Sequence, residues 1–328
     1  MKQKLLYAFV FALTLGLMAA CSKRQDAPQA TQPAAQQTAS AQTASTQNGS
    51  GSVAIAHELG MTVVPLHPAK VAVFDMGTLD IINVIGANAQ IAVPGDIVTS
   101  YLSQYKNDIR IGGIKEPDME GLYNWKPDII FISGRQRAYY PELSRIAPTV
   151  YMQTDPENYL RDMEKHVTEL GKIFGREDLA REKLAALTAK VDKAKAAAAG
   201  TREKALIILT NDGSMSAYGK GSRFGMIHDI FGIPAADDTI KPSLHGQEIS
   251  YEYIARVDPE ILYVVDRTAV IGGTKYANAT LDNPLVASTR AAKNGKIVNM
   301  DAEAWYLTAG GLTATDRMID DILAGLGK

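Results

Sequence analysis

The sequence predicts an α/β protein of two similar α/β lobes, joined by a long helix and separated by a ligand cleft. The first observation is a phrase that occurs twice, at 127–135 and 259–267: a Pro, an acidic residue, an apolar run and a closing Arg, at an offset of 132 residues. The second is that each apolar run is uninterrupted, as is typical of a buried parallel strand, and comes after a short helical pattern. The third is a long helical stretch between the halves. A helix, a strand and a terminal Arg recurring in register indicate two related halves.

The N-terminus predicts export. A positive segment, 1–4, precedes an apolar segment, 5–17, and the small residues before Cys21 resemble a bacterial lipobox, apart from Met18 where Leu is usual. Two interpretations are open: an ordinary signal peptide, or cleavage after residue 20 and lipidation of Cys21, which we favour. Cys21 is the only cysteine, so no intramolecular disulfide can form. Residues 21–52, rich in Ala, Gln, Thr and Ser, predict a disordered tether between the lipid and the folded part.

The first lobe is expected at 53–157. Its predicted strands lie at 63–65, 71–75, 91–94, 109–113, 129–132 and 148–151, and a helix is predicted at 78–84. Linking helices are expected within 158–199, at 159–174 and 178–199, each closed by a Gly. The second lobe, 200–328, has predicted strands at 205–210, 261–265 and 296–300, and helices at 224–231 and 311–326. Strands that alternate with helices place both lobes in the α/β class.

Composition and missing motifs exclude several functions. A formal net charge of −2 argues against a generally basic nucleic-acid binder. Residues 213–221 miss the phosphate-loop spacing, and the glycines at 219–225 miss the dinucleotide pattern, each by one position. Neither a nucleophile elbow nor a His-Glu-x-x-His motif occurs. Because these motifs are missing, the chain is not expected to be an enzyme, and no resident cofactor is expected.

Five residues on loops after predicted strands are candidates for a binding site. Arg135 and Arg267 close the two repeated phrases, and Arg223 lies in a Gly-rich loop that opens a helix. A single such Arg is usually a solvated surface group, but ligands of open α/β sheets bind at the carboxyl ends of strands. Three guanidinium groups there would suit a planar anion. His245, in a loop beside a Gly, and Tyr306, after the last predicted strand, are free to point into the same cleft. His166 is expected on a linking helix, and His228 falls inside the helix predicted after Arg223, where packing is its expected role.

These features resemble the substrate-binding lipoproteins of ABC importers for ferric siderophores and cobalamin, over essentially the whole mature chain. Residues 219–225, 244–246, 264–267 and 305–307 are similar to the catecholate branch, which includes receptors of the enterobactin type. The resemblance implies an Arg triad around a ferric catecholate, at Arg135, Arg223 and Arg267, with Arg137 as the alternative to Arg135. It implies that His245 and Tyr306 are direct iron ligands.

The resemblance also implies partners. Glu120 and Glu252, at equivalent places in the two repeats, are expected to dock into the two subunits of an ABC permease dimer that works with ATPase subunits. The protein is expected to be a lipid-anchored monomer, in a periplasm or on a cell surface, that carries Fe³⁺ only as a siderophore complex.

Chemistry favours a tetradentate catecholate. Fe³⁺ prefers charged oxygen donors and accepts imidazole. A hexadentate tris-catecholate leaves no coordination site, whereas a tetradentate one leaves two, which His245 and Tyr306 could fill. Haem capture is the alternative within binding proteins, although two propionates need fewer than three Arg. An α/β enzyme and a redox or structural metalloprotein are the remaining alternatives. Trp305, if it lines the cleft, would report ligand binding by fluorescence.

Overall fold

The computed structural model describes residues 51–107 and 109–328. Cys21 and the predicted signal peptide lie outside these residues, as does all of the predicted tether up to residue 50. Within the described part of the chain, no helix is both long enough and apolar enough to span a bilayer.

The N-terminal lobe is built on a four-stranded parallel sheet of order β4-β3-β5-β6. Its strands are β3 (Lys70–Val73), β4 (Gln90–Ala92), β5 (Ile129–Ile132) and β6 (Thr149–Tyr151). Helix α1 (Met76–Val84) covers one face, where Ile129 and Phe131 join the main core. Helices α2 (Met119–Trp125) and α3 (Tyr140–Ile146) cover the other, where Ile130 and Ile132 pack. Cover on both faces explains the uninterrupted apolar run of β5.

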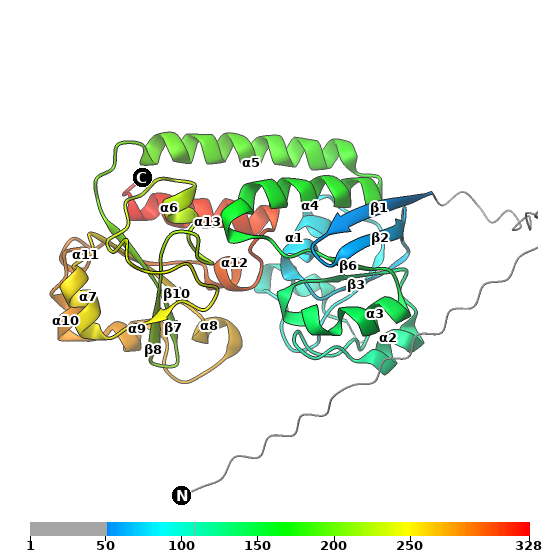
Figure 1. Cartoon of the computed structure of the whole chain (residues 1–328), viewed down its shortest axis with the longest axis horizontal. Helices are drawn as coiled ribbons and strands as arrows, with labels where there is room; N and C mark the ends of the chain where they lie inside the picture. The colour runs from blue at the N-terminus through cyan, green and yellow to red at the C-terminus, as the bar shows by residue number, and fades with distance from the viewer. Residues whose placement is uncertain (1–50, 108) are drawn as a thin grey trace, which may run out of the picture. The chain divides into compact units, whose positions relative to one another are not determined.

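An antiparallel hairpin precedes this sheet. It pairs β1 (Ser52–His57) with β2 (Gly60–Pro65) (Figure 1). Ile55 and Val64 are buried in the main core. The sequence predicted only the part at 63–65. Ser52, at the end of the predicted tether, is already the first residue of β1.

The C-terminal lobe holds a five-stranded sheet of order β11-β10-β7-β8-β9. Its strands are β7 (Ala205–Asn211), β8 (Ser214–Tyr218), β9 (Gln247–Glu248), β10 (Ile261–Asp266) and β11 (Ile297–Asn299). β10 is parallel to β7 and β11, whereas β8 is antiparallel to both of its neighbours. The α/β class and the two-lobed plan are confirmed, with an antiparallel edge in the second lobe that the sequence did not predict.

Short helices surround this second sheet. They are α6 (Met226–Asp229), α7 (Tyr251–Val257), α8 (Thr268–Ile271), α9 (Ala277–Leu281), α10 (Pro284–Ala287), α11 (Arg290–Lys293) and α12 (Ala302–Tyr306), and the chain ends with the longer α13 (Leu312–Gly325). Before the second lobe, the described residues also form the 3₁₀ turns η1 (Ser100–Tyr105), η2 (Gly134–Tyr139) and η3 (Pro156–Asn158).

The predicted repeat is present in detail. α2 and α7 begin at Met119 and Tyr251 and end at Trp125 and Val257, so both ends keep the offset of 132 residues. Each helix starts with a side-chain cap, from Asp118 and Ser250, and each ends at a residue in the left-handed region, Lys126 (φ 56°) and Asp258 (φ 46°). The strand that follows begins at the same relative position in both lobes.

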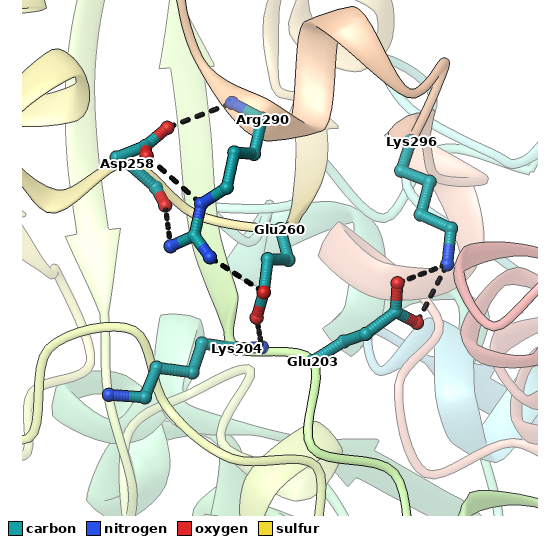
Figure 2. Close-up of polar contacts among 6 residues, drawn as sticks. All are labelled: Glu203, Lys204, Asp258, Glu260, Arg290 and Lys296. Carbon is teal, nitrogen blue, oxygen red and sulfur yellow. Dashed lines mark hydrogen bonds and ion pairs between the residues drawn. The ribbon is translucent and has the colours of Figure 1, made fainter.

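Ion pairs hold the second copy of the repeat in place. Arg290 donates from Nε to Oδ2 of Asp258 (2.9 Å) and from Nη1 to Oε1 of Glu260 (2.6 Å), as Figure 2 shows. The other carboxylate oxygen of Glu260 accepts from the backbone N–H of Lys204 (2.7 Å). The turn into β10 is thereby tied to the start of β7.

Two long helices link the lobes. α4 (Tyr159–Phe174) and α5 (Glu177–Ala198) lie within one residue of the predicted ranges. α5 packs against α4 and against α13 (Figure 1). The buried His166 lies on α4, and burial, followed by the charge of Lys165, lowers its pKa to about 4. Its place on a linking helix is as predicted.

Two expected elements are wrong. Residues 109–113 form no strand among the described residues; Gly112 has φ 95° and makes a single bridge to Pro117, because the Gly-Gly pair turns the chain. The helix expected at 224–231 is reduced to α6, four residues long, and Gly232 (φ 68°) closes it. His228 lies in this short helix with Nδ1 2.8 Å from the carbonyl of Ile233, which is a packing contact.

Candidate functional site

The carboxyl ends of β5 and β10 present Arg135 and Arg267. Arg135 lies in η2, which a reciprocal pair of bonds between Ser133 and the buried Gln136 holds at the end of β5. Arg267 follows β10 directly. The carboxylate of Asp266, the last residue of that strand, accepts from the backbone N–H of Thr268 (3.1 Å) and of Ala277 (2.8 Å). The chain around each Arg is thus fixed before any ligand arrives.

Tyr306, the last residue of α12, is the centre on which the arginines converge. Nη2 of Arg135 and Nη2 of Arg223 both donate to its backbone carbonyl, at 2.9 and 2.7 Å. Nε of Arg267 donates to its phenol oxygen at 2.7 Å. Their guanidinium carbons lie 5.7, 4.3 and 5.5 Å from the centre of its ring. Arg135 belongs to the N-terminal lobe, so this cluster crosses from one lobe to the other.

Positive charge dominates the electrostatics of this cluster. Burial raises the pKa of the Tyr306 phenol, but the hydrogen bond from Arg267 and the charges of Arg223, Arg267 and Arg135 outweigh burial, and the pKa lies below its ordinary value. Burial lowers the pKa of Arg223, and the charge of Arg135 adds to this effect. A guanidinium stays protonated even so. The site is therefore a place where a phenolate, or any other oxyanion, is stabilised.

His245 lines the same hollow. A cavity of about 360 Å³, here called the His245 cavity, is lined by His245, Arg135, Arg223 and Tyr306 among others. The loop that carries His245 is held by a hydrogen bond, in which Oη of Tyr218 donates to the His245 carbonyl (3.0 Å). Oγ of Ser243 accepts from the N–H of His245 and of the next residue, at 3.1 Å each.

A buried carboxylate also reaches this cavity. Asp75, at the carboxyl end of β3, caps α1 by accepting from the backbone N–H and the hydroxyl of Thr78, at 2.8 Å each. Burial raises its pKa, against the hydrogen bonds from Thr78 and the nearby charge of Arg135. Asp75 is a site residue that sequence reasoning missed, although its position at the end of a predicted strand, 71–75, was an available signal.

Arg137 is placed elsewhere. Its Nη1 lies 2.7 Å from Oε1 of Glu58, and it also donates to Oη of Tyr151 (3.2 Å). Arg135, and not Arg137, is the member of this pair that contacts Tyr306. Trp305 is likewise absent from the cavity lining. It is fully buried and donates from Nε1 to Oδ2 of Asp321 (2.9 Å). Trp305 therefore does not line the cleft, as its use as a fluorescence reporter of ligand binding would require.

The remaining sequence candidates lie outside the cavity. Glu120 and Glu252 are exposed on α2 and α7, one in each lobe. Cys21 lies outside the described residues. Among residues 51–107 and 109–328, no cluster of three or more His, Cys, Asp or Glu side chains could hold a bare metal ion.

Comparison with known proteins gives the family. The model of the periplasmic binding protein family matches residues 71–304, which is well over half of the chain. The chain belongs to the periplasmic binding protein family. Residues 71–304 include the sheets of both lobes apart from the first residue of β3. Of the five candidate residues that the sequence predicted, four lie inside that match and Tyr306 lies two residues beyond it.

Several relatives of this periplasmic binding protein cover most of its length. It is 39% identical over 281 residues to the petrobactin-binding protein YclQ of Bacillus subtilis, covering 84% of this chain and 89% of that protein. It is 41% identical over 282 residues to the ferric-anguibactin-binding protein FatB of Vibrio anguillarum, covering 83% and 87%.

Solved structures agree. The structure of the petrobactin-binding protein YclQ matches with a TM-score of 0.81 at 38% identity, covering 85% of this chain and 99% of that one. The structure of the periplasmic catecholate-siderophore binding protein VctP of Vibrio cholerae matches with a TM-score of 0.79 at 34% identity, covering 84% and 100%.

Proposed function

We propose that this protein is the solute-binding component of an ABC importer, that it captures ferric catecholate siderophores with a preference for tetradentate ones, and that it delivers them to a membrane permease. The observation that carries the proposal is the convergence of Arg135, Arg223 and Arg267 on Tyr306, in the wall of a cavity that His245 also lines. The relatives named above are, by their names, binding proteins for petrobactin, ferric anguibactin and a catecholate siderophore.

In this proposal the three positively charged arginines offset the negative charge of the ligand. A ferric catecholate complex carries excess negative charge, because each catecholate brings two anionic oxygens to one Fe³⁺. Tyr306 already holds the three guanidinium groups in place, so their remaining N–H groups can donate to those oxygens with little loss of side-chain entropy. Such charge-assisted hydrogen bonds are stronger than those between neutral groups. Haem propionates would occupy fewer of these donors.

Two protein ligands complete the coordination of iron. A tetradentate ligand leaves two positions of an octahedral Fe³⁺ open, and the His245 imidazole and Tyr306 phenolate are donors that Fe³⁺ accepts. The lowered pKa of Tyr306 supports this role, since less free energy is needed to remove the phenol proton before it binds the metal. A hexadentate ligand would use the arginines alone.

The rest of the chain serves delivery. We assign the lobes to 53–157 and 200–328 with linking helices at 158–199, and we place the lipid anchor on Cys21 behind a signal peptide at 1–20. Glu120 and Glu252 are proposed to dock on a permease dimer, one per lobe. Their support is the repeat itself, which puts both carboxylates one residue after the start of equivalent exposed helices.

A ligand panel with two variants tests the proposal. The wild-type protein is titrated with ferric complexes of a tetradentate catecholate, a hexadentate catecholate and a hydroxamate, and with haem. We expect ligand-to-metal charge-transfer colour and tightest binding with the tetradentate catecholate. His245→Ala and Tyr306→Phe should weaken that ligand at least tenfold and the hexadentate one much less, since one coordinate bond is lost only in the first case. Equal losses for both ligands would reject the metal-ligand roles, and a Soret band with tight haem binding would reject the substrate class.

A further inference from the structure

A second cavity lies against the same tyrosine. This Ile271 cavity, of about 460 Å³, shares Arg135 and Tyr306 with the His245 cavity but is also lined by Arg267 and Ile271, which the His245 cavity does not contact. Its walls come from both lobes: the loops around Ile97 on one side, and α8 with the end of α12 on the other. The proposed function leaves this space without an occupant.

Its lining combines the cations Arg135, Arg267 and Lys115 with apolar surface and with the carboxylates of Asp96 and Glu116. Ile97 and Ile271 face the space from opposite lobes, and Ile271 is 38% exposed, which is unusual for a large aliphatic side chain of this protein. Ile114 and Leu307, both buried, form apolar wall behind them. Arg135 and Arg267 supply the positive charge on the side of Tyr306.

The placement of Ile271 relative to Arg267 follows from one helical turn. Arg267 is the N-cap of α8 and Ile271 its last residue, and the backbone N–H of Ile271 donates to the carbonyl of Arg267 (3.0 Å). Residues four apart on one helical turn project from the same side of it. A guanidinium and an aliphatic side chain are thus presented together, next to the phenol that Arg267 contacts. The facing loop is equally fixed, since Oδ1 of Asp96 accepts from the N–H of Ile114 (2.8 Å).

We propose that the Ile271 cavity is an aryl subsite, which takes one aromatic ring of the chelator with its oxygens toward Arg135 and Arg267 and its faces against Ile97 and Ile271. The inference rests on the proposed function and deepens it. A catecholate has charged oxygens on one edge and two apolar faces, which match this lining. Hydroxamate and α-hydroxycarboxylate groups carry the charge but no such face, so they leave the isoleucines exposed to water. The subsite therefore selects for aromatic chelators independently of the metal ligands.

Removing the apolar wall tests the subsite. The probe is a synthetic tetradentate ferric bis-catecholate, titrated into wild type, Ile271→Ser, Ile97→Ser and the control Leu285→Ser. Leu285, on α10, is 37% exposed and does not line the cavity, so it matches Ile271 in residue class and exposure. We expect each isoleucine variant to bind about fivefold more weakly, from the partial loss of apolar contact, and the control to bind as wild type. Thermal unfolding of all four proteins shows whether the fold is retained.

Salt distinguishes an apolar contact from an indirect effect on the arginines. Added NaCl screens the Arg contribution in every variant, so the ratio between wild-type and Ile271→Ser affinities should stay constant as salt rises. A ratio that falls to one in high salt, or isoleucine variants that bind within twofold of wild type, would overturn the subsite while the proposed function stands. A wild-type protein that binds no ferric catecholate rejects the proposed function, and this inference with it.

Discussion

Gly246 offers a direct test of how the His245 loop is positioned. Gly246 has φ 76°, and a Cβ there would lie 2.7 Å from Cζ and 2.8 Å from Cε2 of Tyr218. Tyr218 is the residue whose hydroxyl supports the His245 carbonyl, and it is itself buried. Gly246→Ala therefore adds left-handed strain and drives the loop away from its support.

Gly232 supplies the matched control. It has nearly the same backbone angle, φ 68°, but a Cβ there would have no atom within 4 Å. Left-handed strain alone is about 1 kcal/mol for a residue with a Cβ, so Gly232→Ala should lower the free energy of unfolding by about that amount. Gly246→Ala carries the same strain, and the overlap with Tyr218 adds about 1–3 kcal/mol, as overpacking does.

Two measurements decide the outcome. Urea unfolding followed by circular dichroism gives the stability of both variants, and titration with a tetradentate ferric catecholate gives their affinity. We expect Gly246→Ala to be less stable than Gly232→Ala by at least 1 kcal/mol and to bind about tenfold more weakly, because a displaced loop misplaces His245. If the two variants have equal stability and equal affinity, the Tyr218 contact does not position the loop.

Two further predictions concern the lobe contact and the transporter. Burial raises the pKa of the Asp80 carboxyl to about 6, although the hydrogen bond from the Ala314 N–H acts to lower it. The protonated Asp80 carboxyl therefore stabilises the fold below pH 4. This stabilisation, up to about 3 kcal/mol, is lost as the pH rises through 6. Asp80→Asn should flatten the dependence of urea unfolding on pH between 4 and 6, and an unchanged slope would contradict this origin. The variant Glu120→Ala/Glu252→Ala should abolish siderophore uptake by cells yet keep wild-type affinity in titration, whereas a loss of affinity would contradict a docking role.

Much of the fold could be predicted because its signals are local. The second copy of the repeat needs only a cap at Ser250, a helix of seven residues and the apolar run of β10, all of which are visible in the sequence. β1 and β8 were missed for the opposite reason. Each belongs to an antiparallel hairpin. The apolar run of β1 is only four residues long and two of the four are alanines, while β8, Ser214–Tyr218, has serines on both sides of Met215. Their pairing is visible only when the partner strand is known.

The arginines of the site could be predicted from a topological rule, but its apolar wall could not. Arg135 and Arg267 each follow a strand of the sheet of their own lobe, and ligands of open α/β sheets bind at the carboxyl ends of strands. Ile97 and Ile271 follow no such rule, because they lie on an irregular loop and at the end of a four-residue helix. Isolated isoleucines in a sequence predict burial, and only the opposing positions of these two around a cavity suggest a ligand contact.

The contact that assembles the site has no sequence signal at all. Two of the three arginines are held by the backbone carbonyl of Tyr306, and every residue type has that carbonyl. What selects this one is the end of α12, because the last carbonyls of a helix have no partner within the helix and carry partial negative charge. Position 306 therefore has two separable roles: its backbone gathers Arg135 and Arg223, while its phenol is bound by Arg267. Tyr306→Phe removes only the second role, so this variant, and not a change that disturbs the helix end, isolates the phenol from the cluster around it.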